Sequence, residues 1–308
     1  MDNPRERDVE VLALDIGGTK LAAGIVDRSG RVRDRRVIPT AREDGADRVL
    51  ERALSLVEEL VANERRADRL PLGLGVSTNG LTREDGVDLA PAVPGWSQLR
   101  IPAALRARFP QLRATVVNDV KAATRAELAW GALHGVSEGL YVNLGTGIAA
   151  GIVWRRQVIE GAHGAAGEVG YIVPSLEALA DRRPGAAVLE ERLGGRGVEA
   201  WTATERGKAI SARELFDSSN ASPIERETRE QLIAEIALWV ANVAIVVDPS
   251  RVVLGGGMIQ SGSELYRRTA EILGEIAPFP IEVVPAHFGA ESALLGAGAV
   301  ALSAEQTG

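Results

Sequence analysis

Cysteine is absent from the 308-residue sequence, and histidine occurs only three times. The absence of cysteine excludes disulfide bonds, thiolate zinc sites and a cysteine nucleophile. With so few histidines, a structural metal site would need an unusual set of carboxylate ligands. Functions that depend on cysteine chemistry are therefore excluded.

Positive charge is outnumbered by negative charge, with 35 Lys and Arg residues against 42 Asp and Glu residues and a formal net charge of −7. This balance argues against a general nucleic-acid interface, which normally presents a positive stripe to phosphate groups. A nucleotide remains compatible, because backbone N–H groups can bind phosphates without a positive surface. We expect no nucleic-acid partner.

Neither a secretory signal nor a membrane span is evident. The N-terminal residues MDNPRERDVEV are charged, unlike the apolar core of a secretory signal. The most apolar stretch, IALWVANVAIVV, is too short for a membrane span and runs into DPS. We therefore expect a cytoplasmic protein with no membrane partner.

The composition, with 45% hydrophobic and 25% charged residues, is that of a soluble globular protein with one large or two medium domains. Two segments resemble each other: LDIGGTKLAAGIV begins at Leu14, and VNLGTGIAAGIV begins at Val142. Each combines an apolar strand, a glycine–threonine turn and a second apolar strand. The repetition predicts an internal duplication with two related lobes, although two hairpins can also resemble each other by chance.

Strands alternate with helices along the chain, and the main helices are predicted at about 46–63, 120–133 and 225–247. This alternation predicts an α/β protein with largely parallel sheets, whose ligands bind beyond the strand ends. We expect an N-terminal lobe of residues 1–118 and a C-terminal lobe of residues 119–308. The closing helix, SALLGAGAVAL, could return to the first lobe.

Three glycine-rich turns follow predicted strands. They contain Gly17, Gly18, Thr19 and Lys20 in the first turn, Gly145, Thr146 and Gly147 in the second, and Gly255, Gly256 and Gly257 in the third. Glycine lets a turn adopt positive φ and lets a phosphate approach the backbone. Asp15, at the strand end before the first turn, could hold magnesium through water. Each turn alone could be a tight hairpin; together they predict a nucleotide held between two lobes.

Carboxylates follow strands as well. VVNDV ends a strand with Asn118 and Asp119, which could simply cap the next helix. A kinase that acts on a hydroxyl group needs an aspartate to orient the nucleophile and take its proton, and the neighbouring asparagine suits a polyol. Glu168, in GAHGAAGEVGYIVP, and Glu190, in VLEERLGG, could accept hydrogen bonds from further hydroxyl groups. The alternative for Glu190 is a solvated helix face.

Taken together, these motifs resemble the ROK family of bacterial sugar kinases and sugar-responsive repressors. From about residue 9 to residue 302, the matching segments in the expected order are ALDIGGTK, GVSTNG, VPGW, NDVKAA, YVNLGTGIAAGIV, GAAGEVGY, LGGG and LLGAGAVAL. The resemblance implies an α/β fold of the two-lobed actin-like class, with duplicated ribonuclease H-like lobes. It also implies transfer of a phosphoryl group from ATP, with Mg²⁺, to a small-molecule sugar.

The resemblance assigns roles to single positions. Asp15 matches the family's magnesium-associated aspartate, and Asp119 matches the catalytic base that activates a sugar hydroxyl, typically O6. The first phosphate loop corresponds to Gly17, Gly18 and Thr19, after which Lys20 could add a cation. The second phosphate loop corresponds to Gly145, Thr146 and Gly147, and the turn near the adenosine to Gly255 and Gly256. The sugar contacts correspond to Asn118, Asp119, Glu168 and Glu190, and Tyr171 stands at the position of a family histidine that binds the sugar. Asn79 and Gly80, in a turn that departs from the family's commoner GPG type, could border the sugar.

Two departures from the family pattern concern zinc. The family's ExGH motif reads Glu168-Val-Gly-Tyr171 here, and its CxCGxxGC cluster is replaced by DRRPGAAV at 181–188. Because all of these zinc ligands are lost, we predict no structural zinc. Tyr171 could offer its O–H to the sugar or be an ordinary half-buried tyrosine, and His163 is expected to be structural.

Both kinases and repressors occur in the family. The first strand begins at Val9, which leaves no room before it for the helix-turn-helix of the repressors, so we expect a kinase rather than a sugar-sensing regulator. Glucose is the default substrate of the family, and a glucokinase-like activity is the first expectation. The three carboxylates would also suit an amino sugar such as glucosamine, 3-amino-3-deoxyglucose or N-acetylmannosamine. A homodimer is the habit of the family.

Overall fold

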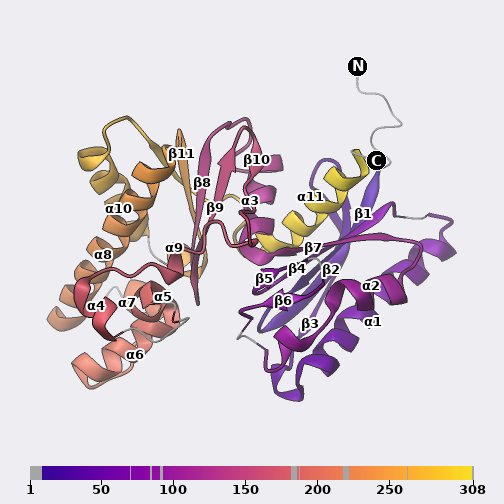
Figure 1. Ribbon diagram of the computed structural model, residues 1–308, viewed down its shortest axis with the longest axis horizontal. Coiled ribbons are helices and arrows are strands. Elements are labelled where there is room, and N and C mark those ends of the chain that lie inside the picture. Colours follow the sequence, from indigo (N-terminus) through magenta and orange to yellow (C-terminus); the bar gives the residue numbers. More distant parts are fainter. Residues whose placement is uncertain are drawn as a thin grey trace. The chain divides into compact units, whose positions relative to one another are not determined.

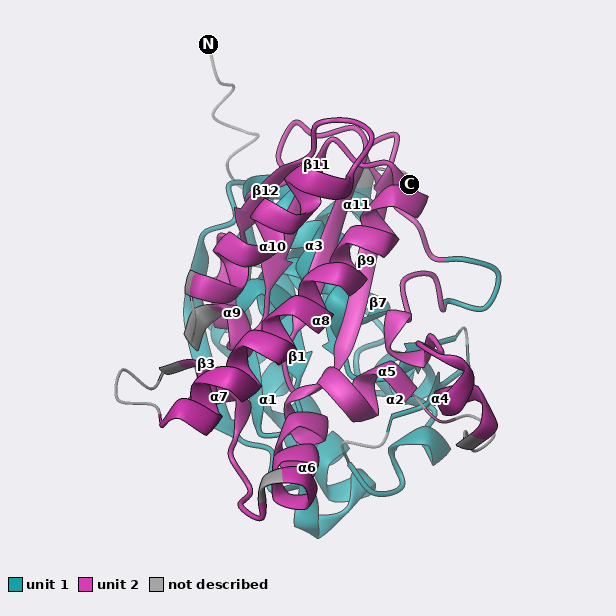
Figure 2. Ribbon diagram, turned by 90° about the vertical axis from the view of Figure 1, so that its left-hand side faces the viewer, with its two compact units in different colours: residues 1–131, 161–164, 291–308 teal, residues 132–160, 165–290 magenta. Residues whose placement is uncertain are grey.

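The computed structural model describes residues 9–69, 71–83, 85–90, 93–181, 186, 188–217, 222–261 and 263–306 (Figure 1). The chain divides into two compact units, which Figure 2 shows in different colours. Unit 1 contains residues 1–131, 161–164 and 291–308, and unit 2 contains residues 132–160 and 165–290. Each unit has its own five-stranded sheet.

Unit 1 is built on a sheet with the strand order β3-β2-β1-β4-β7. Its strands are β1 (Glu10–Ile16), β2 (Lys20–Asp27), β3 (Val32–Pro39), β4 (Gly73–Thr78) and β7 (Arg113–Asn118). β1, β2 and β3 pair antiparallel, whereas β4 pairs in parallel with β1 and β7. The helices are α1 (Ala46–Arg66), α2 (Ile101–Arg108), α3 (Asp119–Trp130) and α11 (Ser292–Gln306), and a short hairpin joins β5 (Leu81–Thr82) and β6 (Val87–Asp88).

Unit 2 repeats this arrangement with the strand order β10-β9-β8-β11-β12. Its strands are β8 (Gly139–Leu144), β9 (Ile148–Trp154), β10 (Gln157–Val158), β11 (Arg251–Gly255) and β12 (Glu282–Pro285). β8, β9 and β10 pair antiparallel, and β11 pairs in parallel with β8 and β12. The helices are α4 (Leu176–Asp181), α5 (Val188–Leu193), α6 (Gly195–Arg206), α7 (Ala212–Asp217), α8 (Pro223–Val247), α9 (Gly257–Ser261) and α10 (Ser263–Ile276).

The equal topology of the two sheets confirms the internal duplication predicted from the sequence. The hairpin β1–β2 corresponds to the hairpin β8–β9, so the two similar sequence segments occupy the same place in the two units. An antiparallel meander that continues into parallel strands is the sheet of a ribonuclease H-like unit. The predicted fold class, an α/β chain of the actin-like type with two such units, is confirmed.

Local sequence explains the principal elements. β4 is buried along its whole length because it lies inside the sheet, whereas the edge strand β3 is polar and largely open to solvent. α8 begins with a capping box. The Ser222 hydroxyl accepts a hydrogen bond from Glu225 N, and the Glu225 carboxylate accepts one from Ser222 N at 2.8 Å.

The C-terminal helix α11 belongs to unit 1, where it packs against α3, β1 and β4. Its approach to α3 is so close that a Cβ at Gly296 would lie 1.8 Å from the carbonyl oxygen of Ala122. Because α3 packs in this way, unit 1 extends to Gly131, beyond the boundary after Asn118 that we expected from the sequence.

Helix α8 is apolar over much of its length. Among the described residues it is the one helix long and apolar enough to cross a membrane, with a window of mean hydropathy 1.7 that is 39% buried. The apolar stretch seen in the sequence is therefore part of a longer helix. One face of α8, including Leu232, Ile236 and Val240, packs in the core of unit 2, and this packing accounts for much of its apolar character.

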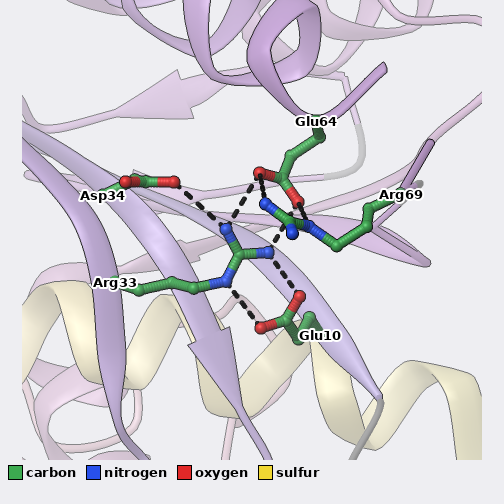
Figure 3. A network of polar contacts seen from close by, with 5 residues as sticks. All are labelled: Glu10, Arg33, Asp34, Glu64 and Arg69. Atoms are coloured by element: carbon green, nitrogen blue, oxygen red, sulfur yellow. Dashed lines mark hydrogen bonds and ion pairs between the residues drawn. The ribbon is translucent and has the colours of Figure 1, made fainter. Parts of the chain in front are cut away.

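A network of charged residues joins separate segments of unit 1 (Figure 3). Arg33 on β3 binds Glu10 at the start of β1, and its Nη2 lies 2.6 Å from Oε2 of Glu64 on α1. Arg69 forms a second ion pair with Glu64, at 3.0 Å between Nε and Oε2. Only 1% of the Glu64 side chain is exposed. Hydrogen bonds from Arg33, joined by those from Arg69, lower the pKa of Glu64 to about 2 against the opposing effect of burial.

We expect Glu64→Gln to lower the free energy of unfolding by about 3 kcal/mol at pH 7. The change would leave two arginines without the buried carboxylate that balances them. Because the pKa of Glu64 is lowered from 4.5 to about 2, its contribution is complete above pH 4.5 and is lost as the pH falls toward 2. Urea denaturation at pH 7 and pH 3 would measure both effects.

Glu58→Gln is the matched control for this prediction. Glu58 also lies on α1 and pairs with Arg108, but its side chain is 48% exposed. Its replacement should cost less than about 1 kcal/mol. If both variants lowered the free energy of unfolding by the same amount, the buried carboxylate of Glu64 would have no greater role than the exposed one of Glu58.

Candidate active site

The parallel strands of unit 1 bring the predicted carboxylates together at their carboxyl ends. Asp15 lies near the end of β1, in register with Ser77 on β4, and Asp119 begins α3 directly after β7. β4 pairs with both β1 and β7, so residues that are far apart in sequence meet at one edge of the sheet. This is the placement expected for a ligand site in such a sheet.

Asp15 is buried, with 7% of its surface exposed. Burial first, and then the negative charge of Asp119, raise the pKa of Asp15 to about 7 against the opposing effects of Ser77 and Lys20. The two carboxylates are therefore close enough to repel each other in a poorly solvated place. A divalent cation would relieve this repulsion, and oxygen ligands of this kind suit magnesium. The residues present therefore fit a magnesium ion beside Asp15.

Asn118 is the N-cap of α3. This is the capping role that the sequence analysis gave as the alternative to sugar binding. Its side-chain oxygen accepts hydrogen bonds from the backbone N–H groups of Val120, at 3.0 Å, and Lys121, at 3.2 Å. Its Nδ2 donates to the carbonyl oxygen of Gly80 at 3.0 Å. An amide NH₂ carries two hydrogens, so one donor remains for a sugar hydroxyl. Asn118 thus fixes the turn that carries Asn79.

Asn79 has the surroundings of a ligand-binding residue. Both polar atoms of its side-chain amide are buried, and neither meets a hydrogen-bond partner among the described residues. A buried amide without partners is costly. A bound molecule that offers both a donor and an acceptor, as a sugar does, would satisfy it.

In unit 2, the second and third glycine turns lie side by side. Gly145 N donates to the carbonyl oxygen of Gly147 at 3.1 Å, which closes the turn between β8 and β9. A Cβ at Gly256 would lie 2.3 Å from the carbonyl oxygen of Leu144. Only glycine permits this approach, so the turn after β11 is held directly against the end of β8.

These turns border a hollow of about 680 Å³ in unit 2. Its other lining residues include Arg196, Glu199, Ser211 and Arg213, from α6 and the start of α7. The backbone of α6 is tied to the turn, since Gly195 N donates to the Gly145 carbonyl at 2.9 Å. Sequence reasoning missed these charged residues, because they follow no motif and their helices reach the turns only in the folded unit.

The stretch GAHGAAGEVGYIVP places Glu168 against β9. A Cβ at Gly167 would lie 2.0 Å from the Ala150 carbonyl oxygen, and Ala150 N donates to the Gly167 carbonyl at 2.7 Å. The small residues therefore allow the segment to lie directly on the strand. Glu168 follows at the start of a 3-10 helix, Val169–Tyr171.

Three predicted sugar ligands gather in unit 2. Tyr171 is half-buried; burial raises the pKa of its hydroxyl, and the negative charges of Glu168 and Glu190 raise it further. Glu190 is not on a solvated helix face, because its Oε2 accepts a hydrogen bond from Ile148 N at 2.9 Å. The same oxygen would lie 2.5 Å from a Cβ at Gly147. Glu190 thus lies against the second glycine turn, a contact that its sequence neighbours did not indicate.

The segment 161–164 that precedes these ligands belongs to unit 1. Lys121 on α3 is 2% exposed, and its Nζ donates to the Gly164 carbonyl oxygen. His163 in this segment is exposed, and its structural rather than catalytic role stays a prediction.

The segment that replaces the family's cysteine cluster is described only in part, since residues 182–185 and 187 lie outside the described residues. Leu189, just after it, is 2% exposed in the core of unit 2. Within the described ranges, no group of three or more histidines, aspartates and glutamates is arranged to hold a metal ion. The absence of structural zinc stays a prediction.

Comparison with known proteins identifies relatives over nearly the whole chain. The model of the ROK family matches residues 11–304. The N-acetylmannosamine kinase of Escherichia coli O139:H28 is 28% identical, over 94% of this chain and 97% of that protein. The ROK hexokinase of Thermus thermophilus aligns with a TM-score of 0.84 at 28% identity, over 97% of this chain and all of that one. A ROK family glucokinase from Streptomyces griseus, in complex with glucose and AMPPNP, aligns with a TM-score of 0.77 at 22% identity, over 96% and 99% of the two chains.

Proposed function

The chain belongs to the ROK family, and we propose that it is a kinase that transfers the γ-phosphoryl group of ATP to O6 of a hexose. The observation that carries this proposal is the pair of carboxylates, Asp15 and Asp119, at the carboxyl ends of neighbouring strands in unit 1. A protein that only senses a sugar transfers no phosphoryl group and would not need both carboxylates. The similarity to kinases from Escherichia coli and Thermus thermophilus supports the same activity.

In this mechanism, Asp119 orients the sugar hydroxyl and takes its proton as the oxygen attacks phosphorus. Asn79 supplies an unsatisfied amide for the sugar, and Glu168, Tyr171 and Glu190 supply further hydrogen-bonding groups. Magnesium, when bound, neutralises charge on the phosphates. Asp15 is the residue that would hold it.

The donor would occupy the glycine turns. Backbone N–H groups of the first turn, 17–19, and of the second turn, 145–147, would bind its phosphates. The hollow of unit 2 beside Gly145 and Gly257 would receive the nucleoside. The complex of the Streptomyces griseus glucokinase with AMPPNP supports ATP as the donor.

A second candidate is an amino-sugar kinase for glucosamine, 3-amino-3-deoxyglucose or N-acetylmannosamine. It is favoured by the similarity to an N-acetylmannosamine kinase and by the tyrosine held near two glutamates in unit 2. An ammonium group would pair with a carboxylate there, whereas an acetamido group would use the Asn79 amide.

We expect ATP-dependent phosphorylation of at least one sugar in a panel of glucose, mannose and the three amino sugars, ranked by kcat/KM in a coupled ADP-release assay. NMR of the product would identify the phosphorylated oxygen. The 6-deoxy analogue of the best substrate is the matched control, because it lacks the proposed acceptor and should give no product. Equal turnover of this analogue would contradict transfer to O6, and ADP release with none of the sugars would contradict the kinase assignment.

A further inference from the structure

We propose that Thr40 is a positioning residue for the phosphoryl donor, because it fixes the first phosphate turn, 17–19, from behind. Thr40 follows β3 directly and is fully buried. It has no place in the glycine motif itself. The inference rests on the proposed function, in which that turn binds phosphate.

Thr40 holds both ends of the turn with two separate hydrogen bonds. Its side-chain Oγ1 donates to the carbonyl oxygen of Gly17 at 2.7 Å. Its backbone N donates to the carbonyl oxygen of Thr19 at 3.0 Å. A third bond within the turn, from Gly17 N to the Lys20 carbonyl oxygen at 3.0 Å, completes its closure.

These bonds decide which way the backbone N–H groups point. The C=O of Gly17 and the N–H of Gly18 belong to one planar trans peptide, and they point in opposite directions. Drawing the Gly17 carbonyl oxygen toward the Thr40 hydroxyl therefore aims the Gly18 N–H away from Thr40. An N–H fixed in advance binds a phosphate oxygen without an ordering cost at the moment of binding.

Arg52 on α1 holds Thr40 in turn. Its Nη2 donates to the carbonyl oxygens of Thr40, at 2.5 Å, and Ala41, at 2.9 Å, and its Nη1 binds Asp44 at 2.6 Å. Ala41 has a left-handed backbone with φ of 48°, which a residue with a Cβ adopts only when its surroundings impose it. The arginine thus keeps the segment after β3 in the conformation that places the Thr40 hydroxyl under the turn.

Thr40→Val and Thr40→Ser form the matched test, since valine keeps the shape of threonine without the hydroxyl and serine keeps the hydroxyl. We expect Thr40→Val to raise the Kd for magnesium with a non-hydrolysable ATP analogue about tenfold, as the loss of one well-placed hydrogen bond implies. The KM for ATP should rise in parallel, while the KM for the sugar stays within about twofold. Thr40→Ser should bind within about twofold of the wild type. Calorimetric titration and steady-state kinetics measure these quantities.

Arg52→Gln tests whether Arg52 holds Thr40 in place, and it changes no residue of the turn. We expect the Kd for magnesium with the ATP analogue to rise roughly threefold. Arg36→Gln is its control, because Arg36 also ties β3 to α1, through Glu59, whereas the hydrogen bonds described for Thr40 are to Gly17, Thr19 and Arg52. It should leave the Kd unchanged. If Thr40→Val does not fold, this pair of variants decides the question.

Two results would overturn the inference. One is an equal Kd for the ATP analogue in Thr40→Val and Thr40→Ser. If Thr40→Val does not fold, the corresponding result is an equal Kd in Arg52→Gln and Arg36→Gln. The other is an equal loss of affinity for analogue and sugar together with a lowered melting temperature, which would mean a purely structural role. Failure of the wild type to phosphorylate any sugar would instead count against the proposed function, so the two failures are distinguishable.

Discussion

Replacing Asp119 by Asn is expected to lower kcat about a thousandfold, the effect of removing a general base. Asparagine has nearly the same shape and cannot accept the hydroxyl proton. The Kd for the sugar should change by less than about fivefold, because the amide oxygen still accepts one hydrogen bond. A coupled assay for kcat and calorimetric titration of the sugar separate these two quantities.

The position of Asp119 makes this variant a clean test. Its Oδ1 accepts a hydrogen bond from Val120 N at 2.9 Å, and the side chain is only partly buried, so the fold should tolerate asparagine. Asp47→Asn is the control, since Asp47 is an exposed aspartate in the first turn of another helix, α1. Turnover of Asp119→Asn close to that of Asp47→Asn would rule out Asp119 as the base.

The elements that carry the site were readable from the sequence because they depend on local pattern. Apolar strands followed by glycine turns gave the two hairpins, and their repetition gave the duplicated topology. The meeting of Asp15 and Asp119 also follows from the sequence once the strands are taken as parallel, since their carboxyl ends then share one edge. Local pattern therefore sufficed to predict the elements and which of their ends lie at the same edge of the sheet.

The remaining features depend on side-chain contacts between distant segments. Nothing near Glu190 in sequence indicates that its carboxylate receives the N–H of Ile148. The Arg33–Glu64 ion pair likewise spans 31 residues. Asn118 could be a cap or a sugar ligand by residue type alone, and only the geometry of α3 shows that its oxygen is occupied by the cap. Such contacts are fixed by packing, which sequence periodicity does not specify.

Replacing Asp15 by Asn should abolish most activity and yet stabilise the fold. A carboxylate that helps to hold magnesium contributes several kcal/mol in the transition state, so we expect kcat/KM for ATP to fall at least about a hundredfold. In the absence of magnesium and nucleotide, however, the wild type carries a buried charge repelled by Asp119. Asparagine removes that charge.

The sign of the stability effect follows from the pKa. For Asp15 the pKa is raised from 3.8 to about 7 on folding, so its ionisation disfavours the folded state. Its contribution to stability is fully present below pH 3.8 and is lost as the pH rises through 7. A shift of this size corresponds to roughly 4 kcal/mol at about 1.36 kcal/mol per pH unit.

Thermal unfolding with a metal chelator should therefore show Asp15→Asn melting several degrees above the wild type at pH 8 and close to it at pH 4. Asp119→Asn should give a smaller gain, because it removes only the repulsion and leaves Asp15 buried. Asp47→Asn again serves as the control and should show no such pH dependence. If Asp15→Asn melted below the wild type at pH 8, the buried carboxylate would have to be stabilised by its partners. A cation beside Asp15 would then have no charge repulsion to relieve.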